Sequence, residues 1–259
     1  MKTTHTRRKT FGRRLRRGFT LAELVVSLGL GMLIMEMAMK FFTQNYLFMY
    51  TNEQKLTINK DMRYLTGQMS DDARYANFFV LYSSYTSTAR ATASQELAEA
   101  NSGDFLVFVF YGTPVSGAPV NVRPVSEIVG YYREPYSASN QISIDPITGA
   151  VNSGATALEP VHRFDLTVAA GTLAANQYLE TTNVPSGGTS TTIEALLPNS
   201  SAATIASHPI VVQLAQGLAD GCLFHNFWGK SVMINGQIVQ GNNYVSASNT
   251  YNFTISPRG

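Results

Sequence analysis

The sequence predicts an α+β protein in which one long N-terminal helix packs on an antiparallel β-sheet head. No proline occurs before Pro114, and apolar residues follow a helical pattern from Phe19 to about Ala76. Beyond that point come short runs of β-branched and aromatic residues, separated by polar segments of small residues. We therefore divide the chain into an N-terminal segment (1–18), a first helical part (19–40), its amphipathic continuation (41–77) and a β-rich head (78–259).

The first part of the helix is apolar enough to cross a membrane. From Phe19 to Met39 the charged residues are Glu23 and Glu36. At about 1.5 Å rise per residue this run spans roughly 30 Å, the thickness of a bilayer's hydrocarbon core. Eight Lys and Arg residues and no acid precede Phe19. The positive-inside rule then places the N-terminus in the cytoplasm and everything after about Lys40 outside.

The junction between the basic leader and the apolar helix carries a specific motif. A carboxylate in a membrane helix costs on the order of 2.5–3.5 kcal/mol at the bilayer centre, so Glu23 requires a partner. Gly18-Phe19-Thr20-Leu21 with Glu23 two residues later resembles the processing site of type IV pilins and type II secretion pseudopilins. The resemblance implies cleavage by a prepilin peptidase between Gly18 and Phe19, and N-methylation of Phe19. It also implies pairing of Glu23 with the N-terminal amine of a neighbouring subunit.

This resemblance implies a pilin-like fold and a structural subunit, not an enzyme, with no cofactor. The subunit would wait in the bacterial inner membrane with its head in the periplasm, and then enter a type IV pilus or a type II secretion pseudopilus. Its partners would be prepilin peptidase, other pilin or pseudopilin subunits, the inner-membrane assembly platform and, before assembly, membrane lipid. The pattern Met62-Arg63, Leu65 and Ser70-Asp71 is similar to J-type minor pseudopilins. A major pilin is the alternative within the family.

Other interpretations of the N-terminus explain fewer of its residues. A secretory signal needs small residues at the end of the apolar run, which Glu36-Met37-Ala38 fits poorly. A plain signal anchor accounts for topology but not for the offsets of Gly18, Phe19 and Glu23. The basic leader could also contact nucleic acid or anionic lipid. The alternative function is a membrane-anchored adhesin or binding module that acts through its loops.

Charge and cysteine content also bear on function. Cleavage after Gly18 would leave 11 basic and 17 acidic residues. An acidic exported chain argues against sequence-independent nucleic-acid binding, which depends on concentrated Lys and Arg. Cys222 is the only cysteine, so no intrachain disulfide can form, unlike in many pilins. We expect Cys222 to be a buried, inert thiol in a strand.

The sequence contains no recognisable catalytic or metal-binding constellation. The histidines are scattered without ligand spacing: His5, His162, His208 and His225. His162 and His225 lie in strand-like runs and are expected to be structural, and His5 would be lost with the leader. Asp71 and Asp72 should form a solvated helix face. Residues 145–149 read as a turn, with calcium binding there as a weak alternative because few other carboxylates are near. No nucleophile or phosphate-binding motif is present, so we expect neither catalysis nor a metal.

Within the helix, spacing predicts one packing face and one ion pair. The face that should pack on the head recurs at steps of four and three: Ile58, Met62, Leu65, Met69, Ala73 and Ala76. Glu36 precedes Lys40 by four residues, which favours a local ion pair near the outer membrane interface. Glu36 is also the second candidate for assembly, after Glu23. Gly29 and Gly31 indicate close helix packing or mild flexibility.

Strands are expected over residues 78–82, 105–111, 128–133, 162–168, 210–214, 223–227, 232–234, 237–239 and 251–255. Asn235-Gly236 between two short runs predicts a tight hairpin turn, because such turns need positive φ at both positions. Residues 91–100 could form a short helix. The stretch 186–192 is expected to be a mobile surface loop.

Overall fold

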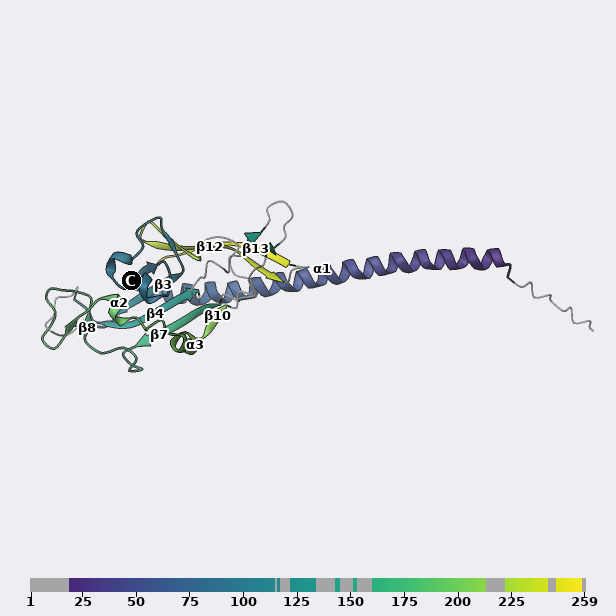
Figure 1. Cartoon of the computed structure of the whole chain (residues 1–259). Helices are drawn as coiled ribbons and strands as arrows, with labels where there is room; N and C mark the ends of the chain where they lie inside the picture. Colours follow the sequence, from purple (N-terminus) through teal and green to yellow (C-terminus); the bar gives the residue numbers. More distant parts are fainter. Residues whose placement is uncertain are drawn as a thin grey trace, which may run out of the picture. The chain divides into compact units, whose positions relative to one another are not determined.

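The computed structural model describes residues 19–114, 116, 122–133, 143–144, 151–152, 160–212, 222–241 and 246–257. The chain divides into two compact units, Met1–Phe48 and Met49–Gly259. The boundary falls within helix α1 (Leu21–Tyr75). A long N-terminal helix followed by antiparallel sheets confirms the predicted α+β class (Figure 1).

Helix α1 has nearly the predicted bounds, since it begins two residues later and ends one residue earlier than expected. Among the described residues it is the one helix long and apolar enough to cross a membrane, judged by length and composition. In the second unit, the predicted packing face is confirmed: all six of its residues are buried, namely Ile58, Met62, Leu65, Met69, Ala73 and Ala76.

The larger sheet is antiparallel and has the order β1-β3-β4-β7-β10. Its strands are β1 (Phe78–Tyr82), β3 (Phe105–Tyr111), β4 (Val125–Arg133), β7 (Val161–Thr167) and β10 (Ile210–Val212). The bounds of β1 and β3 are those predicted. Strand β4 begins three residues earlier than expected, and residues 213–214 lie outside the described residues.

The second sheet has the order β13-β12-β11-β2. Its strands are β2 (Ser102–Gly103), β11 (Phe224–Phe227), β12 (Ser231–Gly241) and β13 (Ser246–Ile255). Two small strand pairs accompany the sheets: β5 (Ser143–Ile144) with β6 (Val151–Asn152), and β8 (Gln177–Tyr178) with β9 (Thr189–Ser190).

The predicted hairpin at Asn235-Gly236 is wrong. Strand β12 continues through both residues, which pair with Asn252 and Tyr251 of β13. An Asn-Gly pair is a local signal, and here a long antiparallel partner keeps the backbone extended. The tight reversal lies instead between β11 and β12, where Trp228 and Gly229 have φ of 57° and 64°.

Several loop predictions also need correction. Residues 91–100 contain one 3₁₀ turn, η2 (Ala93–Gln95), which follows another, η1 (Ser87–Ala89). The stretch 186–192, predicted as a loop, contains β9. Two short helices that were not predicted follow it, α2 (Ile193–Leu196) and α3 (Ala202–Ser207). The turn predicted at 145–149 lies outside the described residues.

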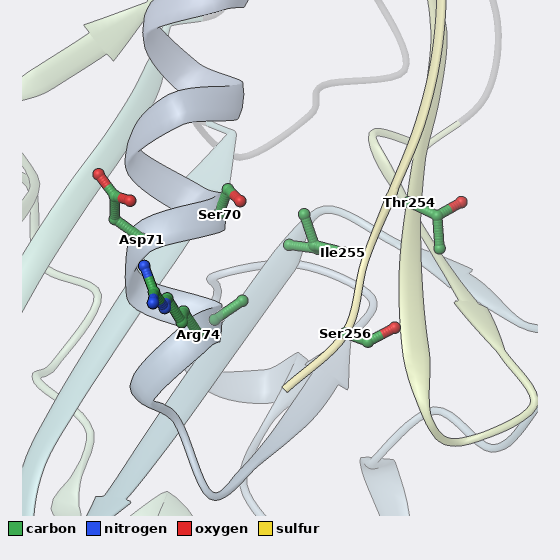
Figure 2. A pocket seen from close by; sticks show the side chains of 7 residues that line it. Ser70, Asp71, Arg74, Thr254, Ile255 and Ser256 are labelled. Atoms are coloured by element: carbon green, nitrogen blue, oxygen red, sulfur yellow. The ribbon is translucent and has the colours of Figure 1, made fainter. Parts of the chain in front are cut away.

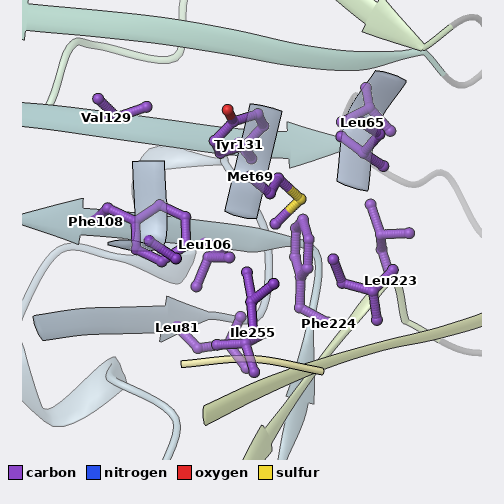
Figure 3. Close-up of a cluster of buried hydrophobic side chains, with 14 of the residues drawn as sticks. Leu65, Met69, Leu81, Leu106, Phe108, Val129, Tyr131, Leu223, Phe224 and Ile255 are labelled. Carbon is purple, nitrogen blue, oxygen red and sulfur yellow. The ribbon is translucent and has the colours of Figure 1, made fainter. Parts of the chain in front are cut away.

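The larger sheet is buried on both faces at its second strand, β3. Leu106 and Phe108 point to a core formed with α1 and the second sheet, which includes Met69 and Phe224 (Figure 3). The alternating residues, such as Phe105, pack in a second core under the loops and the short helices. A strand buried on both sides reads as a continuous apolar run, which is why β3 was predictable.

An ion pair ties the two sheets together at the ends of their strands. The Arg133 guanidinium lies 2.6 Å from the Asp104 carboxylate, and both side chains are at least nine-tenths buried. The other Asp104 oxygen accepts a hydrogen bond of 2.8 Å from the Leu223 amide, just before β11. Because each charge is buried, the removal of either partner would leave the other uncompensated.

Candidate functional site

The predicted processing site lies at the start of α1. Gly18 lies outside the described residues. Phe19 and Thr20 precede the helix and are exposed, and the side chain of Phe19 is 84% exposed. The helix proper begins at Leu21, so Glu23 lies in its first turn.

Thr20 and Glu23 cap this helix start reciprocally. The Glu23 amide donates to the Thr20 hydroxyl at 3.2 Å, and the Thr20 amide donates to Glu23 Oε2 at 3.0 Å. The Thr20 hydroxyl also donates to the same Glu23 oxygen, at 3.1 Å. This is a capping box, which satisfies two backbone donors that a helix start leaves unpaired. The pattern Thr20-x-x-Glu23 is the sequence signal of this cap.

The cap changes what Glu23 requires from a partner. Its carboxylate already accepts two hydrogen bonds within its own chain, and it lies at the helix N-terminus, where negative charge is favourable. Thr20 supplies no positive charge, however. No ion pair among the described residues neutralises the Glu23 carboxylate, so the cap supplies hydrogen bonds but leaves the charge uncompensated.

Beyond the cap, the apolar side chains of α1 lie uncovered in the first unit. Every described residue from Phe19 to Met49 is exposed except Ala38, which is half-buried. The large apolar side chains of this stretch are between 40% and 84% exposed. A Cβ placed on Gly29 or Gly31 would meet no atom within 4 Å. No described residue of the chain therefore explains why these positions are apolar or small.

The second assembly candidate, Glu36, forms the ion pair that its spacing predicts. Its Oε1 lies 2.7 Å from Lys40 Nζ, and both side chains are more than half exposed. Exposed pairs at this spacing contribute only about 0.2–0.5 kcal/mol to a helix.

The predicted solvated face at Asp71 and Asp72 is wrong for one of its two members. Asp71 is exposed, but Asp72 is half-buried and lies 3.2 Å from the Arg163 guanidinium of β7. The Tyr131 hydroxyl of β4 donates a hydrogen bond to the same carboxylate. Burial and this hydrogen bond raise the pKa of Tyr131, which therefore stays protonated. This network fastens the end of α1 to the larger sheet.

An open groove lies on the other side of the same helix end (Figure 2). It has a volume of about 410 Å³ and is lined by helix residues Ser70, Asp71, Ala73 and Arg74 and by Thr254, Ile255 and Ser256. Ser70 and Asp71 both line this groove beside strand β13, and Ser70 lies on the side of the helix nearer to Ile255 (Figure 2). The groove is polar, and its two charged side chains are exposed.

The histidines have structural partners. His162 stacks on Tyr132 with ring centroids 5.2 Å apart, and its Nδ1 lies 3.1 Å from the His208 carbonyl oxygen. His208 Nδ1 is 2.8 Å from the Tyr132 hydroxyl. His225 Nδ1 lies 2.8 Å from the Ser102 hydroxyl. His5 lies outside the described residues.

The remaining chemistry of the head is sparse. Cys222 precedes β11 and is half-buried, which corrects the prediction of a buried thiol in a strand. Burial and the nearby Asp104 raise the pKa of this thiol, so it is a poor nucleophile. In the part of the chain that the structure describes, no group of three or more His, Cys, Asp or Glu side chains could hold a metal ion.

Comparison of the chain with protein-family models, with curated proteins and with solved structures finds no match in any of the three.

Proposed function

We propose that this protein is a pilin-like structural subunit, a minor pilin or minor pseudopilin of a type IV pilus or a type II secretion pseudopilus. One observation carries the proposal: an apolar helix segment, exposed on all sides, begins at Leu21 directly after Gly18-Phe19-Thr20 and carries Glu23, capped with Thr20, in its first turn. The subunit would be cut by prepilin peptidase after Gly18. It would rest in the inner membrane with its N-terminus in the cytoplasm before it joins other subunits.

The exposed segment supports this proposal through its energetics. Burial of a Leu, Ile, Val or Met side chain is worth about 1.5–3 kcal/mol, so a helix with this many uncovered apolar residues is not stable in water. Lipid would cover the segment before assembly, and the corresponding helices of neighbouring subunits would cover it in a filament. Both environments accept a helix that is apolar all round.

Glu23 distinguishes assembly from simple anchoring. A simple anchor gains only the helix cap from a carboxylate in its first turn, and the charge itself opposes insertion. In a filament, the amine of Phe19 from a neighbouring subunit would supply the cation that the capping box leaves missing. The apolar segment alone would equally suit an exported binding module held by a signal anchor. The offsets of Gly18, Phe19 and Glu23 favour the subunit.

The N-terminus of the protein, purified from membranes of cells that carry a prepilin peptidase, tests this proposal. Mass spectrometry should find a chain that begins at N-methylated Phe19. Gly18→Leu should leave the full-length precursor in the membrane. Gly12→Leu, a change at the other glycine of the leader, should be processed normally. An intact Met1 in the unaltered protein, or normal processing of Gly18→Leu, would contradict the proposal.

A further inference from the structure

The hairpin between β11 and β12 presents the only tryptophan of the chain at its tip, in an unfavourable backbone conformation. Trp228 has φ of 57° and is 67% exposed. Left-handed backbone disfavours bulky L-residues, and glycine would occupy this position without strain. An exposed Trp ring adds little to the core. A strained residue of this kind at a surface turn points to a role in binding.

A cavity of about 250 Å³ lies beside this tip. It is lined by Glu99, Ala100, His225, Asn226, Phe227 and Trp228. Phe227 is 47% exposed, and its ring is nearly perpendicular to that of Trp228, with centroids 6.1 Å apart. Two crossed aromatic rings therefore form part of the cavity wall.

Asn226 holds the cavity in shape. Its Nδ2 donates to the Leu97 carbonyl oxygen at 3.0 Å, and its Oδ1 accepts from the Gly229 amide at 3.0 Å. Its main chain also bonds to Ala100 and Asn101. These bonds join the hairpin to the segment that carries Glu99, so the site is formed before any ligand binds. They also occupy the amide, which leaves it little capacity to bind a ligand.

The one acidic group of the cavity has no cationic partner among the described residues. A Cβ on Gly229 would lie 3.1 Å from Glu99 Oε1, which places this carboxylate against the hairpin tip. Lys230 directly follows the hairpin tip in sequence, but no ion pair joins it to Glu99. The site thus combines aromatic walls with an uncompensated negative charge.

We infer that this aromatic-acidic cavity binds a basic side chain, arginine or lysine, of another protein. Aromatic faces attract cations, and tryptophan does so most strongly. The apolar walls would cover the aliphatic stem while Glu99 meets the charged head. A sugar would also stack on Trp228. A sugar, however, needs more hydrogen-bonding groups than the Glu99 carboxylate and the His225 ring provide. This binding site goes beyond the assembly role of α1.

The single tryptophan makes the site directly observable, because all indole fluorescence of the full-length protein in detergent comes from Trp228. We would titrate the protein with an acetylated and amidated Gly-Arg-Gly peptide at constant ionic strength. The same peptide with citrulline, a neutral analogue of arginine, and methyl glucoside would be the comparison ligands. The arginine peptide should change the emission saturably, with a dissociation constant on the order of millimolar, as expected for one anchored side chain. The citrulline peptide should bind about tenfold more weakly, as loss of the charge contribution implies.

Two variants separate the acid from the rest of the surface. Glu99→Gln should weaken binding of the arginine peptide by about tenfold, as loss of one charge-assisted contact implies. Glu96→Gln, on the same segment but outside the cavity lining, should not change it. Equal binding of the arginine and citrulline peptides, saturation by methyl glucoside alone, or no saturable change would overturn the inference.

Trp228→Gly tests whether the tryptophan serves binding or folding. Because glycine relieves the left-handed strain, this variant should keep or raise the melting temperature of the head. The unaltered protein should broaden the NMR signals of the arginine peptide on binding. The Trp228→Gly variant should not broaden them. A large fall in melting temperature, or retained broadening, would contradict a binding role for Trp228.

Discussion

The two parts of helix α1 use the same apolar residue types in opposite ways. In the first unit they lie on every side of the helix and stay exposed. In the second unit they form one stripe, from Ile58 to Ala73, which the two sheets bury. The first part is apolar nearly throughout, whereas the second part is rich in polar and charged residues and keeps its buried apolar residues on one face. A stripe can be covered by the chain's own head, whereas a helix that is apolar all round must be covered by something outside it.

The largest expected contrast is between one leucine from each part. Leu65→Ala should lower the unfolding free energy of the head by about 2–5 kcal/mol, because Leu65 is 1% exposed in the main core. Leu33→Ala should leave it unchanged, since Leu33 is 54% exposed in the first unit. Denaturant unfolding in detergent, followed through signals of the head, would measure both. Equal effects of Leu65→Ala and Leu33→Ala on the unfolding free energy would contradict the difference between the two parts of α1.

A smaller effect is expected where α1 is fastened to the larger sheet. Asp72→Asn should destabilise the head by roughly 1–2 kcal/mol, because it weakens the bonds to Tyr131 and Arg163 in a partly screened site. Asp71→Asn, one residue away and exposed, should stay within about 0.5 kcal/mol. If thermal unfolding showed the two variants to be equally stable, the contacts of Asp72 with Tyr131 and Arg163 would have no role in holding α1 on the larger sheet.

Two glycines of α1, one in each unit, form a matched pair of positions. Replacing either by alanine should change the stability of the head by about 1 kcal/mol or less. A Cβ on Gly29 or on Gly67 would meet no atom within 4 Å. Gly67→Ala should therefore stabilise the head by up to about 1 kcal/mol, through helix propensity alone. Gly29→Ala should leave the head unchanged but reduce recovery in filaments, if neighbouring helices approach at this position. Full recovery of Gly29→Ala would show that no close contact forms there.

The smallest effect concerns the pair between Glu36 and Lys40. Lys40→Gln should cost about 0.2–0.5 kcal/mol of helix stability, and Glu36→Gln the same. Both should lower subunit levels in the membrane slightly and equally, as quantitative immunoblotting would show. Loss of assembly with Glu36→Gln alone would instead assign Glu36 to a contact between subunits.

The predictions that held depended on residues close together in the sequence. The buried face of α1 and the bounds of β1 and β3 follow from local periodicity. The Thr20 cap was also local and was overlooked. Asp72 was misjudged because its partners Tyr131 and Arg163 lie 59 and 91 residues later. Asn235-Gly236 was misread because strand pairing with β13 outweighs the local turn preference.

The tip of the hairpin at Trp228 had no usable signal in the sequence. A left-handed Trp is atypical, so no turn rule identifies it. Its cavity joins residues 99–100 to residues 225–228, which the pairing of β2 with β11 and the hydrogen bonds of Asn226 bring together. A site formed by such distant segments follows from the fold and not from a motif.

The variant Glu23→Gln tests most directly the central claim, that the charge of Glu23 serves contact between subunits. Glutamine at this position of a capping box still accepts the hydrogen bonds from Thr20, so the helix start is kept while the charge is lost. The measurement is recovery in sheared filaments, or in crosslinks to partner subunits, relative to the membrane level. Glu23→Gln should insert and be processed normally but be recovered poorly, whereas Thr20→Val, which keeps the charge, should assemble better than Glu23→Gln. Recovery of Glu23→Gln equal to that of the unaltered protein would contradict the claim and leave Glu23 as a helix cap.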